Sequence, residues 1–240
     1  MPTMPLPMTL PGSPRNVYLG LVAFSLVGTA LSRGLRLNPG PIAPIASLLT
    51  LGFAIATVWP RRMDHGVADR AFLARAGLAM MAGAGAEIAS LYTGWPFGHY
   101  RYSDAWWPTV ELPGGLRFPL ALPFAWLMVT LAALRATRNP WIAGVLAAGV
   151  DLVMEPVMVH DLRYWTWNPA GPLPGDAPWR NLFGWWITAT VGAHLLHSPH
   201  KRESGEDSAE AERARDGWVV LVAHLAMCFG LMLLIRRLPV

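Results

Sequence analysis

The sequence predicts an all-α, polytopic membrane helix bundle with about seven transmembrane helices. Of its 240 residues, 53% are hydrophobic and only 14% are charged, whereas a soluble domain carries about 25% charged residues. Apolar runs of this size could not be hidden in one soluble core. The 19 basic residues lie in small groups between the runs, as bilayer anchoring predicts. They form no basic face or stripe, so the distribution excludes a nucleic-acid partner.

Seven apolar runs approach the roughly 20 residues that a spanning helix needs. They cover residues 17–32, 42–59, 71–92, 118–134, 141–159, 181–197 and 217–235. Asn38-Pro39-Gly40-Pro41 supplies the turn between the first two runs, and Pro60 closes the second. The expected single transmembrane domain therefore covers residues 17–240.

Two segments are expected to lie outside the bundle. Residues 1–16 contain several prolines and no charge before Arg15, which indicates a disordered leader and not a signal peptide. Residues 198–216 interleave charges of both signs, which is typical of a solvated linker or a short surface helix. We assign no chemistry to either segment.

Two polar stretches interrupt the apolar pattern. The first, TGWPFGHYRYSD at 93–104, contains Trp95, Phe97, His99, Tyr100, Arg101, Tyr102 and Asp104. The second lies between 151 and 186 and is similarly rich in aromatic residues. With seven spans, loops 93–117 and 160–180 fall on the same side of the membrane. We expect them to converge on one site, on the side away from the cytoplasm by the positive-inside rule.

The third run contains GLAMMAGAGAE, in which Gly77, Gly83 and Gly85 alternate with alanine. Small residues let helix backbones approach closely in lipid. Helix–helix contact is therefore the expected role of this stretch. Glu87 follows it, inside the helix and about two turns before Gly94.

Acidic side chains inside membrane helices are functional candidates because they are expensive to bury. Asp151 and Glu155 are four residues apart in the fifth run and should share one helix face. Two carboxyls that are close in a low dielectric cannot easily both ionise, so at least one should stay protonated as a general acid requires. The alternative is that the acids pair with Arg101, Arg163 or backbone groups and only lock helices together.

Tryptophan is abundant and has two expected roles. Trp59, Trp126, Trp141 and Trp218 are explained as interfacial anchors. The remaining tryptophans cluster in the two polar stretches, where aromatic faces could stabilise a cation and form a flat wall for a polyene. This cluster comprises Trp165, Trp167, Trp179, Trp185 and Trp186, facing Trp95, Trp106 and Trp107.

Several chemistries are excluded or demoted. A retinal protein needs a lysine in a span, but Lys201 lies in the charged linker. The spacing of His194, His197 and His200 is interrupted by proline, and no second histidine cluster exists for a metal centre. A phosphate loop, a dinucleotide fingerprint and a serine elbow are also missing. Acid–base chemistry without a cofactor, or transport, remains.

These motifs together resemble one family. TGWPFGHYRYSD with the preceding Glu87, LPFAW at 122–126, the Asp151/Glu155-Pro156 pair, Trp165-Thr166-Trp167 and NLFGWW at 181–186 occur in its order. The chain resembles the membrane-integral carotenoid 1,2-hydratases, which include bacterioruberin-precursor hydratases, over roughly residues 75–197. The family favours Asp-Pro at 155–156 and a G-x-Y-x-G-I-P element where this chain has GPLPGDAP at 171–178.

The resemblance implies a carotenoid biosynthesis enzyme of the cell membrane. It implies addition of water to the terminal C1=C2 double bond of an acyclic carotenoid such as lycopene or a γ-carotene-like substrate, without a cofactor. Asp151 would donate the proton, and Glu155 or Glu87 would position or deprotonate the water. Asp104 would be the one direct participant from a rim formed by 93–104. The residues expected to contact the substrate are Trp95, Phe97, His99, Tyr100, Arg101 and Tyr102 of this rim, with Trp165, Trp167, Asn181 and Trp185.

Three other functions stay open from the residues alone. A carotenoid isomerase or cyclase would also work by protonation. A carrier or transporter of a lipophilic molecule would use the carboxyls to couple to protons. A structural membrane subunit would leave the clustered acids and aromatics without a role.

Overall fold

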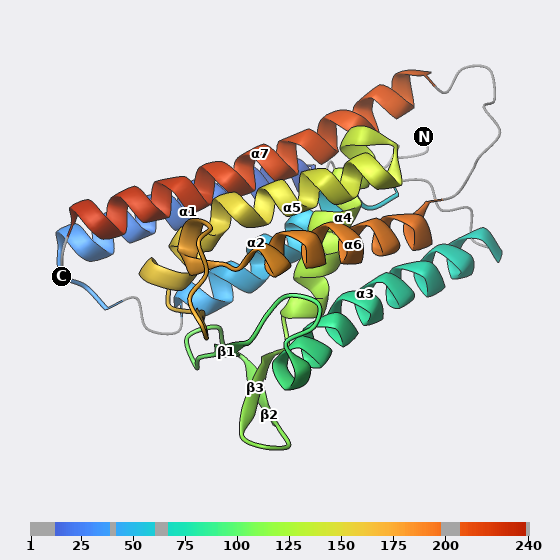
Figure 1. The fold of residues 1–240 in the computed structure, drawn as a ribbon. Coiled ribbons are helices and arrows are strands. Elements are labelled where there is room, and N and C mark those ends of the chain that lie inside the picture. Colours follow the sequence, from blue (N-terminus) through green and yellow to red (C-terminus); the bar gives the residue numbers. More distant parts are fainter. Residues whose placement is uncertain (1–12, 39–41, 61–66, 198–206, 239–240) are drawn as a thin grey trace, which may run out of the picture.

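The computed structural model describes residues 13–38, 42–60, 67–197 and 207–238, and within these ranges the protein is mostly helical. Among the described residues, seven α-helices form a bundle, and two short two-stranded sheets lie at one end (Figure 1). The helices are α1 Pro14–Gly34, α2 Ile42–Val58, α3 Val67–Thr93, α4 Leu122–Thr137, α5 Pro140–Pro156, α6 Trp179–Leu196 and α7 Asp207–Arg237. Each of the seven predicted runs overlaps one of them. The all-α prediction omitted the four short strands.

Four stretches of the described chain are long and apolar enough to cross a membrane, as expected of a multi-pass membrane protein. They are Pro14–Gly34, Arg70–Thr93, Pro140–Asp161 and Glu210–Arg237. α2 and α4 are apolar but shorter, with 17 and 16 residues. The structure thus supports four of the seven predicted spans by length and composition.

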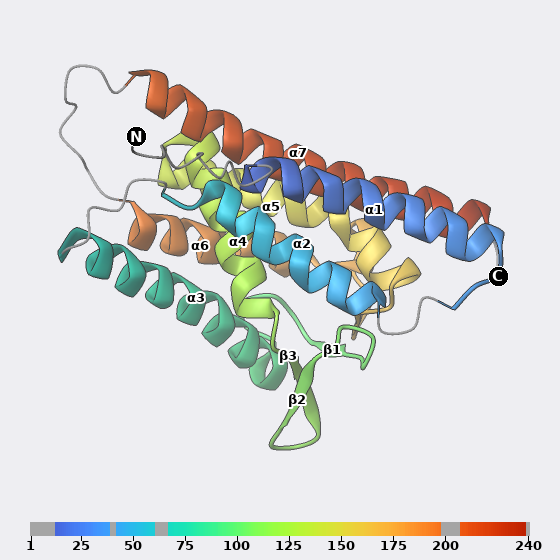
Figure 2. The same ribbon diagram turned by 180° about the vertical axis from the view of Figure 1, so that it is seen from behind.

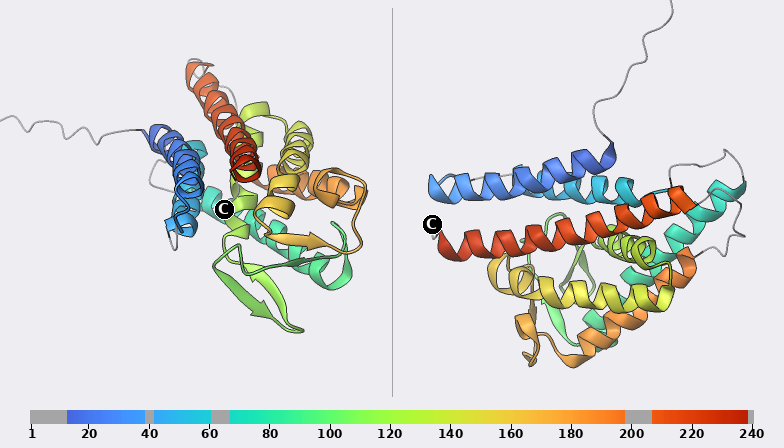
Figure 3. Two further views of the ribbon diagram at one scale, coloured as in Figure 1. Left: turned by 90° about the vertical axis from the view of Figure 1, so that its left-hand side faces the viewer. Right: turned by 90° about the horizontal axis from the view of Figure 1, so that it is seen from above.

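The short helix α4 lies at the centre of the bundle. It packs against α2, α3, α5, α6 and α7, and Leu131, Ala132 and Ala133 on it are almost completely buried. It runs steeply across the direction of α5, α6 and α7 (Figure 1) and is seen end-on from above (Figure 3). Protein surrounds this helix on most sides, so its length need not match the bilayer.

Helix α5 is bounded by clear local signals. The Asn139 side chain caps its start by accepting hydrogen bonds from the backbone N–H groups of Trp141 (2.9 Å) and Ile142 (3.3 Å). Pro156 lacks an N–H, and the chain continues as a π-helical turn, Val157–Asp161. The N–H of Leu162 bonds to the carbonyl of Val157 at 2.8 Å. Such turns frequently occur at functional sites.

The two polar stretches meet, as predicted. Strand β1 (Tyr100–Tyr102) pairs antiparallel with β4 (Trp165–Trp167), so that Tyr100 faces Trp167 and Tyr102 faces Trp165. Strands β2 (Thr109–Leu112) and β3 (Leu116–Pro119) form a hairpin that projects from the same end (Figure 2). The fourth predicted run therefore begins too early, because residues 118 and 119 belong to β3.

The two segments expected to lie outside the bundle are described only in part. Residues 1–12 and 198–206 lie outside the described residues. Residues 14–16 belong to α1, and residues 207–216 form the first turns of α7. Asp216 is buried and lies 3.5 Å from Arg15, while Glu210 pairs with Arg138. Of the two alternatives given for this segment, the described residues 207–216 are helical, and the charge of Asp216 faces α1.

Candidate active site

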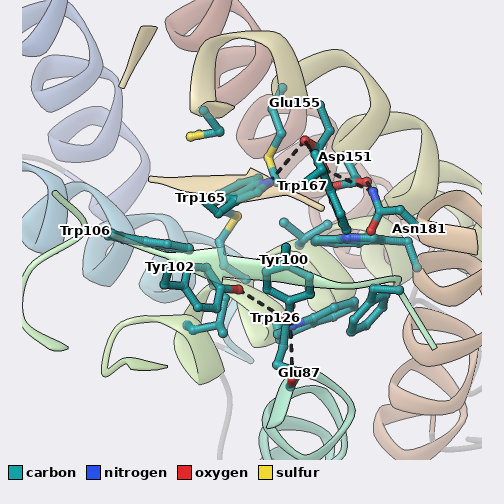
Figure 4. A pocket seen from close by; sticks show the side chains of 18 of the residues that line it. Glu87, Tyr100, Tyr102, Trp106, Trp126, Asp151, Glu155, Trp165, Trp167 and Asn181 are labelled. Carbon is teal, nitrogen blue, oxygen red and sulfur yellow. Dashed lines mark hydrogen bonds between the residues drawn. The ribbon is translucent and has the colours of Figure 1, made fainter. Parts of the chain in front are cut away.

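A partly open cavity lies among α3, α4, α5, α6 and the β1–β4 ribbon, and its empty space, including the part open to solvent, is about 650 Å³. Three carboxyl groups, those of Glu87, Asp151 and Glu155, line it together with the Asn181 amide. The rest of the wall is aromatic or apolar, and Figure 4 shows the aromatic side chains directed into the hollow. All three acids are buried. The cavity thus combines the deep acids and the aromatic wall that the sequence predicted.

Asp151 and Glu155 share one face of α5, as predicted from their spacing. Asn181, in the first turn of α6, lies opposite and donates from one amide nitrogen to both. That nitrogen is 2.6 Å from Asp151 Oδ2 and 3.1 Å from Glu155 Oε1. Asp151 Oδ1 is buried and has no hydrogen-bond partner among the described residues. One oxygen of Asp151 is therefore unsatisfied by protein at the cavity wall.

Glu155 is held entirely by donors. Its Oε2 accepts from the indole N–H of Trp165 at 3.3 Å and of Trp167 at 3.1 Å. Indole nitrogen cannot accept a hydrogen bond, and the Asn181 nitrogen cannot either. Donors that satisfy both carboxyl oxygens stabilise the ionised form. At Glu155 these donors therefore offset part of the cost of burying an ionised carboxyl group.

Gly175, within GPLPGDAP, lets the second loop close over Glu155. Its φ is +71°, and a Cβ there would lie 2.6 Å from the carbonyl carbon of Glu155. Any side chain would collide with the α5 backbone, so glycine is required for both conformation and space. The departure from the family pattern in this loop thus lies directly against one of the acids.

Glu87 lies on α3 and is surrounded by aromatic donors. The hydroxyls of Tyr100 and Tyr102 both donate to Glu87 Oε2, the latter at 3.0 Å. The indole N–H of Trp126 donates to Oε1 at 3.0 Å. Burial, and then the nearby Glu87 carboxyl, raises the pKa of both tyrosines well above the usual value. They therefore remain neutral phenols that can donate.

Trp126 corrects a sequence-based prediction, because it was assigned to the lipid interface and is instead part of the site. It is only 2% exposed. The centroid of its ring lies 4.0 Å from that of Trp185 and 5.7 Å from that of Phe97, and both pairs are stacked. Gly83 makes this possible, since a Cβ there would lie 2.4 Å from Trp126 Cγ. The small residues of α3 therefore also leave the space that the Trp126 side chain occupies.

The structure divides the predicted contact residues into two groups. Phe97, Tyr100, Tyr102, Trp165, Trp167, Asn181 and Trp185 line the cavity, as does Trp106. Four others lie outside its lining: Trp95, His99, Arg101 and Asp104. Trp95 is 63% exposed, and the His99 ring packs against Gly94.

Asp104 was expected to be the rim residue that takes part directly. Its side chain is 73% exposed and lies 2.7 Å from the guanidinium of Arg117. The structure also does not show the alternative in which the acids pair with Arg101 or Arg163. The hydrogen-bond partners that hold Glu87, Asp151 and Glu155 are neutral phenols, indoles and an amide.

Some cavity residues were not predicted. Met154 and Met158 are contributed by the α5 region and His224 by α7. A methionine or a lone histidine within an apolar helix carries no signal that distinguishes a cavity wall from a core. For Trp126, the LPFAW motif was the available signal. Within the described ranges, His, Cys, Asp and Glu side chains form no group of three that could hold a metal ion.

Comparison with known families places this geometry in context. Residues 43–239 match the family described as carotenoid biosynthesis protein. The chain belongs to this family. The chain is also 30% identical over 203 residues to a Haloarcula japonica protein named bisanhydrobacterioruberin hydratase. The alignment covers 75% of this chain and 64% of that relative, so the chain spans less than two thirds of its length. No solved structure matches the chain.

Proposed function

We propose that this carotenoid biosynthesis protein is a carotenoid 1,2-hydratase. It adds water across the terminal C1=C2 double bond of an acyclic carotenoid, such as lycopene or a γ-carotene-like molecule, in the cell membrane. The product is a tertiary alcohol. Family membership and the hydratase relative support the substrate class and the reaction. A cavity in which three carboxyls meet an aromatic wall supports the chemistry.

The observation that carries the proposal is the unsatisfied Oδ1 of Asp151. Asp151 Oδ2 accepts from Asn181, so a proton on this acid belongs on Oδ1. Both oxygens of Glu155 and of Glu87 accept from donors instead. Asp151 is therefore the acid that carries a proton free to be given to a substrate in the cavity.

Protonation of C2 by Asp151 leaves a tertiary cation at C1. Aromatic faces attract such a cation, and the stacked Trp126 and Trp185 offer adjacent faces at the cavity wall. The buried carboxylates add favourable charge in a site of low dielectric. The apolar wall limits access by other nucleophiles. Water then adds to C1, and a second carboxylate accepts its proton.

Expression in a lycopene-producing host, followed by mass analysis of the pigments, tests the function. Hydration adds about 18 mass units per end, whereas an isomerase or a cyclase leaves the mass unchanged. A carrier would bind carotenoid without any new product. Recovery of unchanged or isomeric carotenoid alone would contradict the proposed reaction.

Two matched variants test the role of Asp151. Asp151→Asn should lower alcohol formation by about 10² to 10⁴-fold, the usual contribution of a general acid. Asp104→Asn makes the same chemical change at an exposed position outside the cavity lining. It should retain activity within about twofold, because exposed ion pairs contribute little. Equal losses in the two variants would remove Asp151 from this role.

A further inference from the structure

The three acids form two groups on different sides of the cavity. Asp151 and Glu155 lie on α5 and share the Asn181 amide. Glu87 lies on α3 and is held by Tyr100, Tyr102 and Trp126. Figure 4 shows Glu87 on one side, the α5 acids on the other, and the rings of Tyr100 and Trp126 between them. An alkene bound in the cavity would therefore have the α5 acids toward one face, and Glu87 with the tyrosine hydroxyls that bond to it toward the other.

The two candidate bases differ in their ability to hold a water molecule. A bound water needs about two to four polar partners. Beside Glu87, each tyrosine hydroxyl gives its proton to the carboxylate and keeps oxygen lone pairs that can accept from water. Beside Glu155, the indole N–H groups of Trp165 and Trp167 are already donated and offer no acceptor. The surroundings of Glu87 suit a reacting water better.

Position separates the candidates as well. Glu155 is one helical turn from the proton donor and on the same face of α5. Once Asp151 has protonated C2, its carboxylate and that of Glu155 both lie on the face from which the proton came. The opposite face of the C1 cation is the one directed toward Glu87 and the hydroxyls of Tyr100 and Tyr102.

We propose that Glu87 is the catalytic base and that water adds to the face opposite the new C–H bond, so that hydration is anti. This inference rests on the proposed hydratase function. The C1=C2 electron pair takes the proton from Asp151 Oδ1, which becomes a carboxylate. A lone pair of the water oxygen then forms the bond to C1, and Glu87 takes one water proton. Transfer of a proton from Glu87 back to Asp151 through water restores the site.

The stereochemistry can be measured with the unmodified protein. The substrate carries ¹³C in one of the two methyl groups on C1, and the reaction is run in D₂O. C2 then holds one H and one D, C1 holds two distinguishable methyls, and NMR of the alcohol gives their relative configuration. Anti addition in a single diastereomer is expected. Syn addition or a mixture overturns the inference while leaving the hydratase function intact, whereas absence of alcohol means that the hydratase function itself fails.

Azide rescue identifies the base. Glu87→Ala should lower alcohol formation by about 10² to 10⁴-fold. Added azide should then form a tertiary azide at C1, because this nucleophile needs no base, whereas the proton still comes from Asp151. Asp151→Ala should form neither product, and Glu155→Ala is the matched test of the other carboxylate. Azide adduct in Glu87→Ala and not in Glu155→Ala supports the assignment, and any other pattern among these two variants overturns it.

Discussion

Gly83→Ala would insert a methyl group where the ring of Trp126 crosses α3. The added Cβ would lie 2.4 Å from Cγ, 2.8 Å from Cβ and 2.9 Å from Cδ1 of that tryptophan. Separations under about 3 Å are not tolerated, so the ring or the helix must move. Trp126 stacks on Trp185 and also donates to Glu87, so the displacement would alter both the cation wall and the acid.

The size of the effect follows from the contact that is lost. A hydrogen bond to a charged group contributes about 1.5–3 kcal/mol. If the whole of that loss appears in the transition state, the rate falls roughly 10- to 150-fold. Forcing an extra methyl group into a packed interior also destabilises the fold by about 1–3 kcal/mol. We therefore expect a large loss of activity with a moderate loss of stability.

The assay is the initial rate of alcohol formation in membranes that contain equal amounts of inserted protein. Gly85→Ala is the matched control, because Gly85 is in the same helix but a Cβ there would meet nothing within 4 Å. This control should keep its activity and gain up to about 1 kcal/mol of stability from the loss of a helical glycine.

Two results would refute the reasoning about Gly83. If Gly83→Ala retained more than half of the normal rate, Trp126 would not need its observed position. If Gly85→Ala lost as much activity as Gly83→Ala, the loss would result from a change in the flexibility of α3 and not from displacement of Trp126.

Three further outcomes are expected. Asn181→Leu removes the donor shared by Asp151 and Glu155. This variant should lower kcat about tenfold or more with little change in KM. An effect on KM alone would indicate that Asn181 contacts the substrate instead. Gly175→Ala should lower the Tm more than Gly115→Ala, although their φ values are +71° and +72°, because only Gly175 would collide with Glu155. Burial raises the pKa of Tyr100 and Tyr102, so both stay neutral as pH rises through about 10, where free tyrosine titrates. The phenolate absorbance at about pH 10 should therefore be the same in the protein and in its double phenylalanine variant.

Local features of the sequence were sufficient for the class of protein and for part of the site. Long apolar runs identify membrane helices because lipid leaves every backbone polar group to be satisfied within its own segment. The spacing of Asp151 and Glu155 predicts one helix face because the helical repeat is a local property. The shared character of the stretches 93–104 and 151–186, together with the parity of the helices, predicted their meeting, which β1 and β4 confirm.

Contacts between distant residues decided the rest. The role of Trp126 depends on a bond to Glu87, 39 positions away, and on the space at Gly83. The unsatisfied oxygen of Asp151 depends on where Asn181, 30 positions away, directs its amide. A sequence shows which side chains can donate or accept protons, but their partners are set by how the helices pack. Tertiary structure therefore determined which carboxyl oxygen lacks a donor and on which side of the cavity each acid lies.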